Sequence, residues 1–253
     1  MFELTPFFIA LLLTTGLAAG IINVLAGGGS NLTIPALMVM GLPADMANAT
    51  NRVGVMLQSL VGLRGFNNSD RLERSDMLPI LLPTLVGGAT GAAVASLLPN
   101  SLLKPLLLGT MITLSVVMIV KPKTIFPGPD ETPRRIRDRP WAAFGLFLTG
   151  VYGGFVQAGV GFLLIAALAG GLRYDLVRAN ALKLLCAAAF TAVALVIFIA
   201  HGLIAWVPGL ILGVGTMVGA QIGVRLALNV SQTALKWFLL CMTLAASAAA
   251  IWL

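Results

Sequence analysis

The residues of this chain that most clearly indicate a binding site are glycines that interrupt two hydrophobic segments. The first interruption is Gly27–Gly29, followed by the polar residues Ser30 and Asn31, and the second contains Gly159 and Gly161. A helix that begins after such an interruption directs its unpaired backbone N–H groups, and the positive end of its dipole, back at the glycines. Two such helix starts that face each other would form a site for an anion. The competing interpretation is that the glycines only permit close packing.

Polar side chains accompany both interruptions. Asn23 precedes the first and Gln157 precedes the second. Such residues are costly inside a membrane and are often functional. Arg52 and Lys183, at related positions of the two halves, would add positive charge to an anion path, or would instead anchor their helices at lipid headgroups. The candidate substrate-binding set comprises Asn23, Gly27, Gly28, Gly29, Ser30, Asn31, Asn48, Thr50, Asn51, Arg52, Gln157, Gly159, Gly161, Asn180 and Lys183.

The chain lacks the residue combinations that enzymes and metal sites need. His201 is the sole histidine, Cys186 and Cys241 have no metal-ligand spacing, and no Walker A or G-x-S-x-G motif occurs. We therefore expect no enzymatic activity, no catalytic residue, no metal ion and no cofactor. Few acidic residues lie in the hydrophobic segments, which gives little support to a carboxylate proton relay or a sodium cage. The identity of a coupling ion, proton or sodium, stays open.

The composition predicts the elements that must position these residues. Hydrophobic residues make up 58% of the 253-residue chain and charged residues 10%, whereas soluble domains carry about 25% charged residues. Long uncharged stretches approach the roughly 20 apolar residues of a membrane-crossing helix. We predict an all-α integral membrane protein. The basic residues crowded between Lys121 and Arg139 indicate a cytoplasmic loop and not a nucleic-acid site, because they separate two hydrophobic halves.

An internal repeat divides the chain into three parts. Residues 1–120 form a first transmembrane repeat, residues 121–140 a basic cytoplasmic linker, and residues 141–253 a second repeat. The repeats share motifs such as Ala47-Asn-Ala-Thr-Asn51 and Ala179-Asn-Ala-Leu-Lys183. Each is predicted to contain four long helices and one short glycine-broken segment. The long helices are expected at 4–26, 48–66, 77–99, 101–120, 141–158, 182–200, 203–225 and 231–253, and the short segments at 30–41 and 162–170.

Differences between the two copies affect the expected site. Ser30 and Asn31 are good N-cap residues for the first short helix, whereas Phe162 and Leu163 occupy the corresponding positions of the second. We therefore expect an anion cradle to which the first half contributes more than the second. Other glycines spaced four residues apart are interpreted as faces on which helices approach closely. These are Gly87, Gly91, Gly215, Gly219 and Gly223.

The short segments decide how the two repeats are oriented. A dozen helical residues rise only about 18 Å, less than the roughly 30 Å of a hydrocarbon core. If the segments turn back, the repeats are parallel. If the segments complete a crossing in extended chain, the repeats are inverted. The inverted arrangement leaves only Arg52 and Lys104 on the outer side and satisfies the positive-inside rule better, so we predict inverted repeats with both termini outside.

The motifs of the first half resemble those of the TauE/SafE family of membrane proteins, also called the sulfite exporter or TSUP family. The matching motifs are Gly16-x3-Gly20, Gly27-Gly-Gly-Ser30, Pro35-Ala-Leu37, Gly41-Leu-Pro43 and Ala47-x-Ala-Thr-Asn51. The second half carries a weaker copy, so the resemblance covers essentially the whole chain. It implies transport of small sulfur-containing anions such as sulfite, thiosulfate or organosulfonates, usually outward.

These observations lead to one expected function. We expect a multi-pass protein of the inner (plasma) membrane that acts as a secondary transporter. It would export a small sulfur-containing anion by alternating access at a site between the two glycine interruptions. The expected partners are the anion, membrane lipid and a coupling ion, with no nucleic acid, and the oligomeric state is left open. The alternatives are a membrane assembly or accessory protein, and a passive anion channel.

Overall fold

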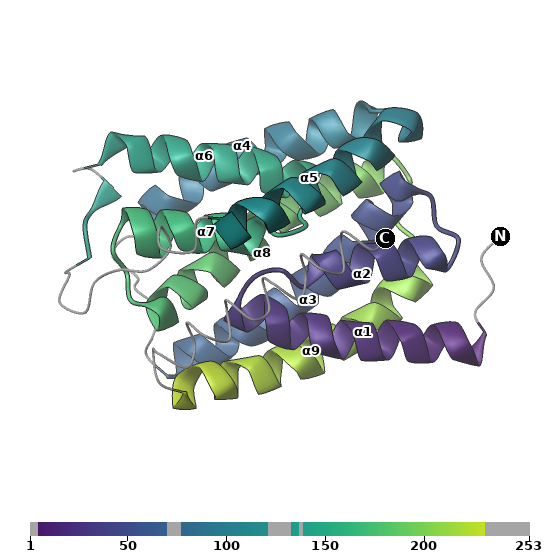
Figure 1. Ribbon diagram of the computed structural model, residues 1–253, viewed down its shortest axis with the longest axis horizontal. Helices are drawn as coiled ribbons and strands as arrows, with labels where there is room; N and C mark the ends of the chain where they lie inside the picture. Colours follow the sequence, from purple (N-terminus) through teal and green to yellow (C-terminus); the bar gives the residue numbers. More distant parts are fainter. Residues whose placement is uncertain (1–4, 70–76, 121–132, 137–138, 231–253) are drawn as a thin grey trace.

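The computed structural model describes residues 5–69, 77–120, 133–136 and 139–230 of the chain. Their regular structure is helical, and the long helices extend along the longest axis of the molecule (Figure 1). The elements are α1 (Pro6–Leu25), α2 (Ser30–Val39), α3 (Ala44–Asn68), α4 (Met77–Leu97), α5 (Asn100–Val120), α6 (Pro140–Phe155), α7 (Val160–Ile165), the π-helix η3 (Ala166–Gly171), α8 (Leu176–Ala200) and α9 (Trp206–Asn229).

Four of the described helices are long and apolar enough to cross a membrane, namely α1, α4, α8 and α9. Large aliphatic side chains stand exposed on these helices, such as Val86 of α4 at 57% and Val214 of α9 at 56%. Side chains of this kind are suited to contact with lipid tails. In the described part of the chain, the prediction of a helical protein with segments long and apolar enough to cross a membrane is confirmed. α3 is as long as α8 but carries Asn48, Asn51 and Arg52, so it is less apolar.

Glycines set the closest helix contacts in the bundle. α1 packs along α9, and α4 packs along α6. A Cβ atom added at Gly16 of α1 would lie 2.7 Å from the carbonyl oxygen of Leu212 in α9. One added at Gly87 of α4 would overlap the backbone of Phe147 in α6. The packing role predicted for the spaced glycines is confirmed, with Gly87 and Gly91 against α6 and with Gly215, Gly219 and Gly223 against α1.

The helix contacts of the two halves follow the same plan. By position in the repeat, the pair α1–α9 corresponds to the pair α6–α4, and α3–α9 corresponds to α8–α4. The repeat-related helices α3 and α8 also pack against each other. Both halves therefore meet along α3 and α8, which are the elements that bring polar side chains to the interrupted helices.

Two helices begin four or more residues before their predicted positions. α3 begins at Ala44 and not at 48, and α8 begins at Leu176 and not at 182. The N-cap residues are Pro43 and Asp175. Oδ1 of Asp175 accepts hydrogen bonds from the N–H groups of Val177 and Arg178 at 3.0 Å. Charged residues in these first turns hide them from a search for hydrophobic segments. Most of the predicted linker at 121–140, and all of the predicted helix at 231–253, lie outside the described residues.

Gly20 and Gly145 offer a matched test of helix packing. A Cβ atom at Gly20 would overlap the carbonyl group of Thr216 in α9, whereas one at Gly145 meets nothing within 4 Å. We expect Gly20→Ala to lower the free energy of unfolding by about 1–3 kcal/mol, because the two backbones must separate. Gly145→Ala should be neutral or stabilising by up to about 1 kcal/mol, because alanine favours helix. Equal thermal unfolding midpoints for the two purified variants would contradict the packing role.

Candidate functional site

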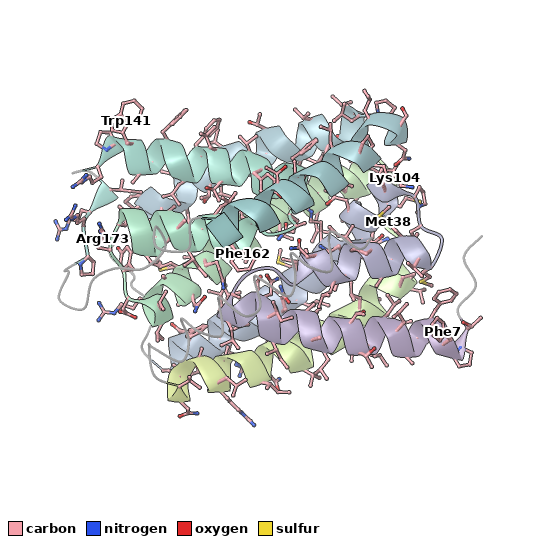
Figure 2. All side chains as sticks on the ribbon, in the orientation of Figure 1. Phe7, Met38, Lys104, Trp141, Phe162 and Arg173 are labelled. Atoms are coloured by element: carbon pink, nitrogen blue, oxygen red, sulfur yellow. The ribbon has the colours of Figure 1, made fainter. Side chains whose placement is uncertain are left out.

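The two glycine interruptions meet inside the bundle. Gly27 and Gly161 lie so close that a Cβ atom added to either would overlap the backbone of the other. Gly27 has a φ of +99° and Gly159 a φ of +72°, in the left-handed region that glycine adopts without strain. Phe162, which follows Gly161 in the chain, lies near the middle of the molecule in Figure 2. The backbones of the two halves are therefore in direct contact at the interruptions.

Backbone N–H groups at this contact lack acceptors. The first turn of α2 uses the carbonyl oxygens of Gly28 and Gly29, which accept from Asn31 and Leu32 at 3.0 Å. Several neighbouring N–H groups donate to no acceptor in the part of the chain that the structure describes, namely those of Gly28, Gly29, Ser30, Gly159 and Gly161. All of these residues are buried. Because buried N–H groups without partners are rare in folded proteins, this contact is suited to receive the acceptor atoms of a ligand.

The start of α2 is capped differently from the prediction. The N-cap is Gly29, which makes no side-chain capping hydrogen bond, so the prediction of Ser30 or Asn31 as N-cap is wrong. Ser30 lies inside the helix, where its Oγ accepts a hydrogen bond from Nδ2 of Asn51 at 3.0 Å. Oδ1 of Asn51 in turn accepts from Oγ1 of Thr33 at 2.5 Å. Asn51 therefore ties α2 to α3 by its side chain and leaves the N–H groups at the helix start available. α7 also lacks a side-chain cap, as predicted.

The last turn of α6 is capped by two residues of α3. Nδ2 of Asn48 donates a hydrogen bond to the carbonyl oxygen of Phe155 at 2.8 Å. Arg52 has no exposed surface, and its guanidinium donates to two carbonyl oxygens and one side-chain oxygen, those of Gly153, Gly154 and Gln157. A cation at the C-terminal end of a helix is favourable because the carbonyl groups there carry partial negative charge. Side chains of α3 thus satisfy the terminal carbonyl groups of α6, the interrupted helix of the other half.

Gln157 connects this cap to the second interruption. Its φ is +66°, which is uncommon for a residue other than glycine. Its Oε1 accepts hydrogen bonds from Arg52 and, at 3.4 Å, from Oγ1 of Thr191 in α8. Such a backbone conformation costs free energy and persists where the surroundings hold it in place. Arg52 and Thr191 provide that hold, directly beside Gly159.

The end of α1 is capped from α8 in a related way. Nζ of Lys183 donates hydrogen bonds to the carbonyl oxygens of Asn23 and Val24 at 2.7 and 2.9 Å, and to Oδ1 of Asn180 at 2.7 Å. Lys183 is 2% exposed. The cation of each central helix therefore binds the carbonyl end of the interrupted helix that belongs to the other half.

Burial rules out one interpretation of these cations. Arg52 and Lys183 lie in the protein interior, so the alternative that they anchor helices at lipid headgroups is wrong. Neither forms an ion pair within the described residues. Two buried positive groups without carboxylate partners give the centre of the bundle an excess of positive charge.

The remaining predicted residues lie around this centre in different roles. Oγ1 of Thr50 accepts a hydrogen bond from the N–H of Ala205 at 3.0 Å, so Thr50 fixes the start of α9 and is not gathered at the interruptions. Oδ1 of Asn31, Oδ1 of Asn48 and Nδ2 of Asn180 are buried and make no hydrogen bond. These atoms are available to a ligand or to water.

Several polar residues outside the candidate set also lie on the helices around the interruptions. Thr33 and Thr191 hydrogen-bond to Asn51 and Gln157, and threonine in a hydrophobic helix gives little signal of its own. Gln58 and Ser59 of α3 are buried, and their side-chain polar atoms have no partners. For Gln58 the signal was its amide within a hydrophobic helix. To identify Ser59 from the sequence, one would have to know which face of α3 is buried.

The structure also contains cavities beside α5. One of about 490 Å³ lies at the junction of α2, α3 and α5, where Asn100 and Lys104 line it. Another of about 290 Å³ lies between α5 and Tyr152 of α6. The hydroxyl group of Tyr152 donates a hydrogen bond to the carbonyl oxygen of Ala158 at 2.6 Å, so this second cavity borders the chain at the second interruption.

Asn51 provides a test of how α2 is held. We expect Asn51→Ala to lower the free energy of unfolding by about 1–3 kcal/mol, because it leaves the buried hydroxyl groups of Ser30 and Thr33 without their partner. Asn229 is a control, since its hydrogen bond to the carbonyl oxygen of Arg225 is exposed. Asn229→Ala should change stability by less than about 0.5 kcal/mol. Thermal unfolding of the purified variants measures both, and a larger effect at Asn229 would refute this account of Asn51.

Comparison with known proteins gives a consistent result. The family model "Sulfite exporter TauE/SafE" matches residues 12–250. The probable membrane transporter protein YfcA of Escherichia coli K12 is 28% identical over 236 residues, 93% of this chain and 87% of the relative. The probable membrane transporter protein ORF9 of Sinorhizobium is 25% identical over 245 residues, 97% of this chain and 93% of the relative. A probable membrane transporter of Haemophilus influenzae is 26% identical over 231 residues, covering 90% and 88%. No solved structure matches.

Proposed function

Because the chain belongs to the sulfite exporter TauE/SafE family, we propose that it is a secondary transporter of a small sulfur-containing anion. Sulfite, thiosulfate and organosulfonates are the candidate substrates, and the direction is outward across the inner membrane. The anion binds between the two glycine interruptions and reaches either side by alternating access. The relatives named above are described as probable membrane transporters, and the substrate class is our inference for this chain.

The observation that carries this proposal is the group of buried N–H donors at the contact between Gly27 and Gly161. The N–H groups of Gly28, Gly29 and Ser30 at the start of α2 have no acceptor in the described chain. Helix starts of this kind bind oxyanions through N–H groups and the helix dipole. Arg52 and Lys183 add positive charge nearby, without carboxylates that would neutralise it. An anion is therefore the ligand that best matches the polarity of the site.

The direction of the helices supports inverted repeats. Phe7, in the first turn of α1, lies at one end of the molecule, and Trp141, in the first turn of α6, lies at the other (Figure 2). Met38 of α2 and Lys104 of α5 lie towards the Phe7 end, and Arg173 lies at the Trp141 end. Since Arg52 and Lys183 are interior, they do not count towards the charge of either side. Arg139, the N-cap residue of α6, also lies at the Trp141 end. The positive-inside rule therefore favours that end as the cytoplasmic one.

Labelling of single cysteines tests the orientation. Phe7 and Trp141 are 68% and 82% exposed, so Phe7→Cys and Trp141→Cys in a background without the native cysteines should react with a thiol reagent. With a membrane-impermeant reagent on intact cells, we expect Phe7→Cys to react and Trp141→Cys to react only after the membrane is opened. Lys104→Cys serves as a second outer position. Reaction of both Phe7→Cys and Trp141→Cys from the same side would mean parallel repeats.

Gly28 is the position at which the site can be filled with least damage to the fold. A Cβ atom there would lie 2.6 Å from the ring of Phe162, a side chain that can move, whereas at Gly29 it would overlap the backbone of Ala19. We expect Gly28→Leu to abolish uptake of labelled sulfite, thiosulfate and sulfoacetate into proteoliposomes, because it occupies the space of the anion. Gly145→Leu faces open space and is the control. Unchanged flux in folded Gly28→Leu would reject the site.

The same proteoliposomes separate the proposal from its alternatives. A transporter gives saturable flux that responds to a gradient of the coupling ion, whereas a passive channel gives flux that does not saturate in the same range. An assembly or accessory protein gives no flux and co-purifies with another protein. Thermal stabilisation of the purified chain by one of these anions would support binding independently of flux, since a ligand of the folded state raises its stability.

A further inference from the structure

The two buried cations differ in how many of their donors are used. A lysine ammonium has three N–H donors, and Nζ of Lys183 has three acceptors at 2.7, 2.9 and 2.7 Å. These acceptors are two carbonyl oxygens at the end of α1 and the amide oxygen of Asn180. Lys183 therefore has no donor left for a ligand in this arrangement.

Arg52 retains unused donors. A guanidinium has five N–H donors, and the hydrogen bonds of Arg52 all come from its terminal nitrogens, to Gly153, Gly154 and Gln157. Its Nε is buried and has no hydrogen-bond partner. The ring of Phe198 covers the guanidinium at 5.5 Å from its carbon to the ring centre, which protects one face from water. A buried N–H of a charged group that is left unpaired is costly, so Nε marks a position where an acceptor binds.

The surroundings of the two cations also differ. Arg52 contacts Gln157, which is two residues from Gly159 and its unpaired N–H group. Its other contacts are the carbonyl groups at the end of α6. Lys183 is enclosed by the end of α1 and by its own helix. The free donor of Arg52 and the free N–H groups of the second interruption can therefore act on one ligand.

We propose that Arg52 is the positive group that contacts the transported anion through Nε, and that Lys183 is a positioning residue that fixes the end of α1. This division of roles rests on the proposed function. One anion oxygen accepts from Nε of Arg52, while the terminal nitrogens of Arg52 keep their hydrogen bonds to α6. The ligand thus binds to a guanidinium that is already oriented. Lys183 contributes the shape of the first interruption and does not touch the ligand.

Two matched substitutions separate the roles, because each gives one cation a carboxylate partner at an existing hydrogen bond. Gln157→Glu provides an internal anion for Arg52, and Asn180→Asp provides one for Lys183. Each adds one negative charge to the bundle centre, and both variants should fold with unfolding midpoints at or above that of the unmodified protein. We expect Gln157→Glu to weaken binding of sulfite and sulfoacetate at least tenfold more than Asn180→Asp. Isothermal titration of the purified protein measures the dissociation constants.

Arg52→Lys and Lys183→Gln complete the test. Lysine keeps the charge but loses Nε, so Arg52→Lys should bind these anions at least about tenfold more weakly, as expected for loss of a charge-assisted hydrogen bond. Lys183→Gln should lower the unfolding midpoint more than Arg52→Lys and lower the maximal transport rate more than it raises the dissociation constant. Stronger loss of binding in Asn180→Asp than in Gln157→Glu, or unweakened binding in Arg52→Lys, would overturn the division. Absence of anion binding by the unmodified protein would instead reject the proposed function, while the unfolding midpoint of Lys183→Gln still tests its positioning role.

Discussion

A helix that stops within a membrane leaves backbone carbonyl and N–H groups where no water can bind them, and the centre of this protein is organised around that constraint. α1 and α6 both end inside the bundle. Their terminal carbonyl groups receive hydrogen bonds from Lys183 and from Asn48 and Arg52. The N–H groups on the other side of each interruption receive no such partners. The protein thus satisfies its carbonyl ends internally and leaves N–H donors available at the site proposed for the anion.

The hydrogen bonds that satisfy the carbonyl ends of α1 and α6 join one half of the chain to the other. α3 belongs to the first half and completes α6 of the second, whereas α8 belongs to the second half and completes α1 of the first. The closest helix pairs, α1 with α9 and α4 with α6, also join the halves. Each half alone would have buried polar groups without partners and glycine faces without neighbours. The two halves of the sequence therefore form one folded unit.

The sequence predicts the general architecture better than the details of the site. Hydrophobic segments and spaced glycines give the helices and their close contacts, because both depend on composition along one helix. The cap of α2 is predicted wrongly, since Ser30 bonds to Asn51 instead of to its own helix start. The backbone carbonyl groups that accept hydrogen bonds from Arg52 and Lys183 lie more than a hundred residues away in the chain. Neither periodicity nor spacing contains such contacts, so side chains that look like interfacial anchors in the sequence are interior caps in the structure.

The contact between Gly27 and Gly161 has a mechanical consequence. At most helix contacts, side chains interlock, and sliding one element past another requires several of them to change rotamer at once. Here two bare backbone segments touch, so a tilt of one half against the other disturbs no interlocked side chains at that point. If the halves tilt against each other in the proposed transport cycle, this contact acts as the pivot point. The N–H groups proposed to bind the ligand lie beside it, where the displacement is smallest. A binding site next to a pivot point keeps its geometry while the openings on either side of it change.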